Sequence, residues 1–211
     1  MSQPLIEELV EELKPSPPPP STAAGLLCWG LLSWFAVMAL ILWSGPLRSG
    51  ALEQLLHIPR FLFECGLGVA VGLVAMAGAL RIATPGRGPS VRVMLPGLML
   101  LGFWIAVYAY GVVSPALAPS MDGYRGSCFL EVLLYSAPPF VLGLLLLRRR
   151  APLEPGIAAG LAAVAAASLP GLAMQLACMY DPLHALGLHL SPMLIVGGVG
   201  ALLGRAFLKR I

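Results

Sequence analysis

Six long apolar stretches run through the chain, each close to the roughly 20 residues that an α-helix needs to cross the hydrocarbon of a bilayer. Short segments with proline, glycine and charged residues separate them. In lipid, a backbone must satisfy its hydrogen bonds within the segment, so each stretch predicts a transmembrane helix. The sequence therefore predicts an all-α fold, an integral membrane bundle of six transmembrane helices, with spans at about 25–44, 61–80, 93–113, 128–147, 156–176 and 186–207.

The fifth stretch differs from the others because it is built largely of alanine and glycine, with Pro170 inside it. Small residues let helix backbones approach closely, so we expect this helix to lie at the centre of the bundle and to bend at the proline. Three pairs of glycines spaced four apart favour close packing within the chain over dimerisation. These pairs are Gly68 with Gly72, Gly156 with Gly160, and Gly200 with Gly204.

The first fourteen residues form an amphipathic pattern ahead of the first span. Apolar side chains recur at helical spacing, and four glutamates occupy the opposite side. A helix this short needs a partner to bury its apolar stripe, and its negative charge disfavours a membrane surface. We therefore expect it to dock in a groove of a cytoplasmic protein, the alternative being an inert tail. The apolar residues of this stripe are Leu5, Ile6, Leu9, Val10 and Leu13.

A proline-rich segment follows the amphipathic stretch, with prolines at Pro15 and at 17–20. Such a run is extended and semi-rigid, so it holds the N-terminal helix away from the first span. The chain is accordingly divided into a cytoplasmic amphipathic helix at 1–14, a proline-rich linker at 15–24 and a six-helix transmembrane domain at 25–211.

Lysine and arginine are divided unequally between the two sides of the predicted spans, ten on the side of both termini and three on the other. Such an excess is typical of the cytoplasmic side, so both termini are expected in the cytoplasm. The outer surface is then three short loops, which suit small ligands or redox chemistry. The outer residues are Arg48, Arg60 and Arg125, and the cytoplasmic ones are Lys14, Arg81, Arg87, Arg92, Arg148, Arg149, Arg150, Arg205, Lys209 and Arg210.

Composition narrows the possible functions. Hydrophobic residues make up 58% of the chain and charged residues 11%, which leaves no room for a separate soluble catalytic domain. The net charge of +3 is not gathered in a basic patch with aromatic side chains, which argues against direct contact with nucleic acid. The sequence also lacks the short motifs of hydrolases, metalloproteases and nucleotide-binding enzymes. We therefore expect a binding or regulatory protein of the lipid membrane, not an enzyme.

Six side chains with metal, redox or proton chemistry are expected at one membrane level, near the outer boundary. Cysteine and imidazole bind soft and borderline metals, carboxylates can complete such a site, and two thiols can instead form a disulfide in the periplasm. A metal ion is then a ligand to be sensed, with no cofactor certain. The sensor candidates are Cys128, Cys178, His184, His189, Glu64 and Glu131.

Each candidate also has an ordinary structural interpretation. Buried cysteines serve as small apolar residues, as we expect for Cys28 and Cys65. A lone histidine commonly caps a helix, and the two histidines here are five residues apart, off the four-residue spacing of a helical ligand pair. The two carboxylates can reach nearby outer water, or pair with Arg60 or Arg125. These alternatives stay open from the sequence.

Several short motifs occur in a recognisable order: IEELVEELKP, the proline linker, RFLFECGLG, SAPPF, RRRAPLEPG, LHALGLHL and GALLGR. With them the chain resembles the NrsF family, six-span anti-sigma factors of the bacterial inner membrane. The resemblance implies that the N-terminal stripe binds an extracytoplasmic-function sigma factor and releases it under envelope, metal or redox stress. The chain has Ser16 and Leu188 where family members often carry basic and aromatic residues, so the sensing chemistry does not follow from the resemblance.

A small transporter or ion-coupled permease is the alternative function. Glu64 and Glu131 would then be substrate or proton sites in a cavity of the bundle. Both carboxylates are predicted near the outer edge of their spans, whereas transport sites lie near the midplane. Their placing therefore favours the regulatory interpretation.

Overall fold

The computed structural model describes residues 21–84, 90–150 and 152–208, and within these residues the fold is helical with no strands. Six helices are long and apolar enough to cross a membrane, which confirms the predicted six-helix bundle. The amphipathic helix predicted at 1–14 lies outside the described residues, as does most of the linker. The elements are α2 (Thr22–Ser44), α3 (Ala51–His57), α4 (Pro59–Ile82), α5 (Ser90–Gly111), α6 (Cys128–Tyr135), α7 (Ala137–Arg148), α8 (Pro155–Ala177), α9 (Pro182–His184), η1 (Ala185–Leu190) and α10 (Ser191–Phe207).

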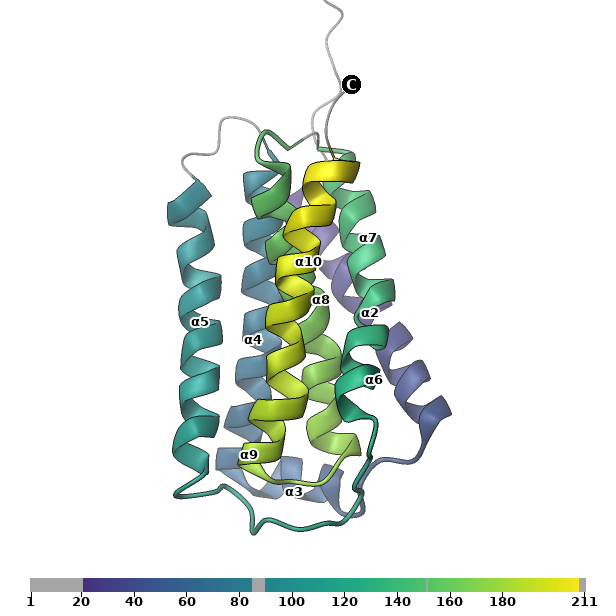
Figure 1. Ribbon diagram of the computed structural model, residues 1–211, viewed down its shortest axis with the longest axis vertical. Helices are drawn as coiled ribbons and strands as arrows, with labels where there is room; N and C mark the ends of the chain where they lie inside the picture. The colour runs from purple at the N-terminus through teal and green to yellow at the C-terminus, as the bar shows by residue number, and fades with distance from the viewer. Residues whose placement is uncertain (1–20, 85–89, 151, 209–211) are drawn as a thin grey trace, which may run out of the picture.

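Helix α8 is the centre of the bundle, as predicted (Figure 1). Nearly all of its side chains are buried, and it packs most extensively against α10 and α4. Its alanines and glycines present little bulk, so neighbouring backbones can approach on several sides. The helix is continuous through Pro170, and a bend there stays a prediction.

The three glycine pairs lie where helices of the same chain pack against one another, as the sequence predicted. A Cβ at Gly72 would lie 2.5 Å from the Ser168 hydroxyl oxygen, and one at Gly68 would lie 2.8 Å from the Trp104 ring. A Cβ at Gly200 would overlap the side chain of Ala163. Each of these glycines is therefore needed where two helices meet.

Three local features differ from simple straight spans. A short helix, α3, lies in the first loop, where only a connection was predicted. The fourth span is divided at Ser136 into α6 and α7, since Pro138 and Pro139 have no N–H to donate to the preceding turn. The sixth span begins with α9 and a π-helical turn, η1, before α10. The change in the sixth span holds two functional candidates, His184 and His189.

The loops gather at two ends of the bundle. One end holds Cys128, Cys178 and the loops that contain Arg48 and Arg125; we call it the cysteine end, the lower end in Figure 1. The start of α2 and the close of α10 lie at the opposite end, where the Arg150 side chain donates to the carbonyl oxygen of Ser21 at 3.2 Å. The first and last spans thus begin and finish on the same side.

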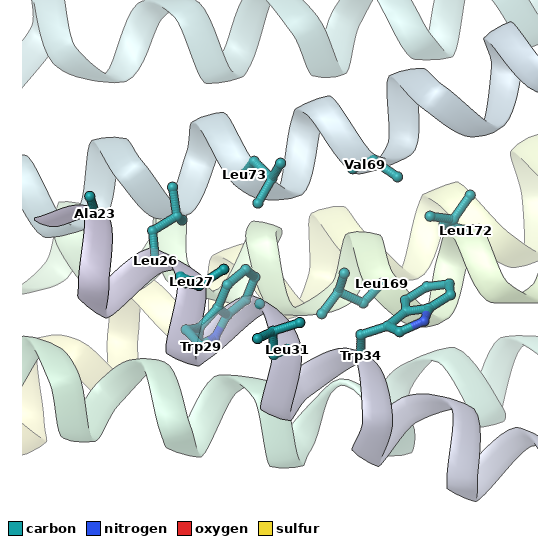
Figure 2. Close-up of a pocket in the computed structure, with 11 residues that line it drawn as sticks. Ala23, Leu26, Leu27, Trp29, Leu31, Trp34, Val69, Leu73, Leu169 and Leu172 are labelled. Carbon is teal, nitrogen blue, oxygen red and sulfur yellow. The ribbon is translucent and has the colours of Figure 1, made fainter.

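An apolar groove of about 420 Å³ lies between α2 and α4, with α8 as its floor (Figure 2). Side chains such as Leu31, Leu73 and Leu169 line it, together with the rings of Trp29 and Trp34. No titratable side chain is among its lining residues. The groove therefore carries no reactive chemistry, and the candidate site lies instead at the cysteine end.

Candidate functional site

Four of the six sensor candidates come together at the cysteine end. Cys128 is the first residue of α6, Cys178 directly follows α8, His184 ends α9, and His189 lies in η1. One possible ligand atom from each lies within 4.8 Å of all the others. Three separate segments of the chain therefore supply one compact group of sulfur and nitrogen atoms.

The two sulfurs are the closest pair, with Cys128 Sγ 2.8 Å from Cys178 Sγ. Both residues are fully buried, and both are free thiols in the structure. The hydrogen bond from Cys128 lowers the pKa of Cys178 well below that of an ordinary thiol. His184 Nε2 lies 3.4 Å from Cys178 Sγ on the other side. Cys178 is thus a thiolate-forming residue between a thiol and an imidazole.

The π-helical turn explains how histidines five residues apart join one site. In a π-helix the repeating hydrogen bond links residues i and i+5, so such residues lie on one side of the turn. The rings of His184 and His189 are 5.1 Å apart between centroids, at an interplanar angle of 84°. Their spacing along the sequence is unsuited to a ligand pair only in a regular α-helix.

Two further side chains contact the histidines, and neither was singled out in the sequence. The Tyr124 ring packs edge-on against His184, with centroids 6.0 Å apart. The Gln175 side-chain nitrogen lies 3.2 Å from Nδ1 of His189. Gln175 is on the buried face of the alanine-rich α8, one turn before Cys178. Only its polarity within an apolar helix could have marked it in advance.

Two arginines hold the C-terminal end of α8, next to Cys178. The last carbonyl groups of a helix have no partner within the helix and carry partial negative charge. The Arg48 backbone N–H donates to the Leu176 oxygen at 2.9 Å, and its Nε donates to the Cys178 oxygen at 3.1 Å. Arg125 Nε donates to the Ala177 oxygen at 3.2 Å. Three successive carbonyls are therefore satisfied by positively charged residues.

Arg125 also joins this helix end to the end of α2 and to α6. Its guanidinium donates to Ser44 Oγ at 2.7 Å and to the Pro46 oxygen at 2.9 Å, and it pairs with Glu131 at 3.2 Å. Cys128 Sγ also lies 2.9 Å from the Arg125 backbone oxygen, so its single proton is shared between that oxygen and Cys178 Sγ. One arginine thus connects the thiol pair with three helices.

Glu64 and Glu131 do not join the cysteine and histidine group. Glu131 pairs with Arg125, and Glu64 Oε1 lies 3.7 Å from Arg60 Nε, so each has the arginine that the sequence offered as an ordinary partner. The fully buried Glu64 also accepts a hydrogen bond of 3.0 Å from the Tyr180 hydroxyl. Burial raises the pKa of Tyr180, which keeps this hydroxyl protonated and able to donate.

The four-residue group could hold a metal ion. Two thiolates and two imidazoles are the donor set of tetrahedral zinc and related soft or borderline cations. The buried Nε2 of His189 has no hydrogen-bond partner among the described residues, as a nitrogen available to a ligand requires. The adjacent sulfurs can alternatively be oxidised as a pair. Metal binding would use all four side chains, whereas oxidation would use only the two cysteines.

Comparison with known proteins identifies the family. No curated protein and no solved structure matches the chain. The family described as NrsF, negative regulator of sigma F, matches residues 9–209, which is nearly the whole chain. This match includes all six candidate spans and all four residues of the cysteine and histidine group. The chain therefore belongs to the NrsF family of negative regulators of a sigma factor.

Proposed function

We propose that this protein is an anti-sigma factor of the bacterial inner membrane. It holds an extracytoplasmic-function sigma factor inactive through the N-terminal segment and releases it when the cysteine and histidine group reacts with a metal ion or an oxidant. The family match supports the regulatory role. The convergence of Cys128, Cys178, His184 and His189 is the observation that carries the sensing role.

The proposed orientation places the cysteine end in the periplasm. The excess of lysine and arginine on the side of both termini supports it. A sigma factor would then meet residues 1–14 in the cytoplasm, while metals and oxidants would arrive at the opposite end of the bundle. The protein itself contacts lipid and the sigma factor, and we expect neither catalysis nor direct contact with nucleic acid.

Two stimuli suit the site. A soft divalent cation would bind the two sulfurs and the two imidazoles, with release of the thiol protons to water. A disulfide or quinone oxidant would instead accept two electrons and two protons, while Cys128 and Cys178 form a sulfur–sulfur bond. In both cases the Cys128 thiol loses its proton and can no longer donate to the Arg125 oxygen.

Arg125 provides the route from the site to the N-terminal segment. The loss of the Cys128 hydrogen bond alters the segment that positions its guanidinium, which also holds Ser44 and Pro46 at the end of α2. Helix α2 leads directly, through the linker, to residues 1–14. A change at the thiols is therefore transmitted along α2 to the segment that binds the sigma factor.

The decisive experiment tests the N-terminal stripe. We expect the double variant Leu9→Asp, Leu13→Asp to insert in the membrane but to lose co-purification with the sigma factor, because charges replace the apolar contacts. The double variant Ser2→Asp, Ser16→Asp adds the same charge outside the stripe and should retain binding. Retention of the sigma factor by the Leu9 and Leu13 variant would place its docking surface in the loops and overturn this role of the stripe.

A further inference from the structure

The two ring nitrogens of His189 have different surroundings. Nδ1 lies 3.2 Å from the Gln175 side-chain nitrogen, whereas Nε2 has no hydrogen-bond partner among the described residues. The Gln175 side-chain oxygen also has no partner there. His189 is fully buried and Gln175 is 1% exposed, so water reaches these atoms poorly. Buried polar atoms without partners are costly, which points to a state in which both are used.

A rotation of the Gln175 amide supplies that state. The amide oxygen and nitrogen exchange places by turning about the last side-chain bond, and no carbon atom has to move. The oxygen then accepts the proton on Nδ1 of His189. This leaves a lone pair on Nε2, the nitrogen that a metal can bind. The rotation gives up the long contact of 3.5 Å between the Gln175 nitrogen and the Gly171 oxygen, and it exchanges the nitrogen for the oxygen opposite Nδ1 of His189.

We propose that Gln175 is a positioning residue for the metal site: it holds His189 with the proton on Nδ1 so that Nε2 binds a metal ion together with Cys128 and Cys178. A metal-bound histidine generally donates its second ring N–H to an oxygen, which fixes its orientation and tautomer. The inference rests on the proposed function, because it concerns the same sensing site. It adds a residue on the central helix that has no metal-binding atom of its own.

The same amide suits the metal-free protein in its other orientation. With the nitrogen toward His189, Gln175 donates to Nδ1, and the ring carries its proton on Nε2. Glutamine can serve both tautomers because its head group contains a donor and an acceptor. A carboxylate at this position could only accept, and would hold His189 in the metal-binding tautomer.

Cobalt binding tests this arrangement in the full-length protein, reduced and purified in detergent. Co²⁺ reports thiolate ligands through a near-ultraviolet charge-transfer band, and competition with Zn²⁺ gives the affinity. The variant Gln175→Met keeps the volume and removes the acceptor, so we expect metal affinity to fall by about 10- to 100-fold. Gln175→Glu restores an acceptor and should bind at least as tightly as the natural sequence.

The outcomes separate this inference from the proposed function. If the natural sequence gives no thiolate band, metal sensing is wrong and the inference fails with it. If the natural sequence binds cobalt and Gln175→Met binds it equally well, the inference alone is overturned. Gln175→Glu decides the case even if the methionine variant fails to fold. Retained affinity in the glutamate variant supports the positioning role, and loss of affinity overturns it.

Discussion

Cys128 and Cys178 are expected to act as one unit, because their sulfurs are 2.8 Å apart and either reaction of the site needs both. We predict that Cys128→Ser, Cys178→Ser and the double variant lose the same fraction of the response to zinc or diamide, read as sigma-dependent transcription. Cys65→Ser and Cys28→Ser should respond normally. A response that persists in the double serine variant would remove the thiols from sensing.

A second prediction for a single residue concerns Arg125. Lysine keeps the charge of Arg125 but has one nitrogen, and it cannot contact Ala177, Ser44 and Pro46 together. Arg125→Lys should still bind cobalt, yet it should release little sigma factor when metal is added. Arg60→Lys is the matched control at the same end of the bundle and should release it normally.

Normal release from the Arg125→Lys variant would show that the signal leaves the site by another path. Loss of cobalt binding in this variant would show instead that Arg125 builds the site itself. Cobalt binding and sigma-factor release, measured together, therefore show whether Arg125 transmits the signal from the site or builds the metal site itself.

Chemical type was enough to select the four residues that the structure brings together, because thiols and imidazoles at a membrane boundary are few in this chain. The pairing of Cys128 with Cys178 was also expected, but the arrangement of the two histidines around these thiols was not accessible. The spacing of His184 and His189 suits a π-helical turn, which has no simple sequence pattern. The contact between Gln175 and His189 joins two different helices, so only the fold reveals it.

At the scale of helices, the contact between α8 and α10 depends on glycine at specific positions. A Cβ at Gly200 would overlap Ala163, so Gly200→Ala should destabilise the bundle by about 1–3 kcal/mol, the usual cost of excess volume in a packed interior. Gly198 lies on the same helix, and a Cβ added there would meet nothing within 4 Å. Gly198→Ala should leave stability unchanged or slightly higher.

The difference in stability between Gly200→Ala and Gly198→Ala can be measured by unfolding both variants in a denaturing detergent. The loss of the helical circular-dichroism signal reports the unfolding. Equal stability of the two alanine variants would mean that α10 can move away from α8 at little cost. The expected difference in favour of Gly198→Ala would identify the α8–α10 contact as a fixed part of the bundle.

The spans were predictable because twenty apolar residues in succession have few other structures available to them in lipid. The irregular elements within and between the spans were harder to predict from the sequence. α3 is only seven residues long and depends on its packing against α4. The break at Ser136 was visible as a pair of prolines, but proline alone does not decide between a bend and a division of the helix.

At the scale of the molecule, both termini are predicted in the cytoplasm. The end of the bundle that holds the start of α2 and the close of α10 also carries most of the basic residues that the structure describes. Alkaline phosphatase fused after Ile211 should therefore be inactive, while green fluorescent protein fused there should fluoresce. The opposite pair of results would place the cysteine end in the cytoplasm and contradict the proposed path of the stimulus.

The complete burial of the two sulfurs decides how a signal could end. A metal ion can leave the site when its external concentration falls, so a metal response is reversible within the life of each molecule. A disulfide formed there would be buried at the cysteine end, out of reach of a thioredoxin-sized reductase. An oxidised molecule would thus stay oxidised after the oxidant is gone, and the cell would restore repression by synthesising new protein.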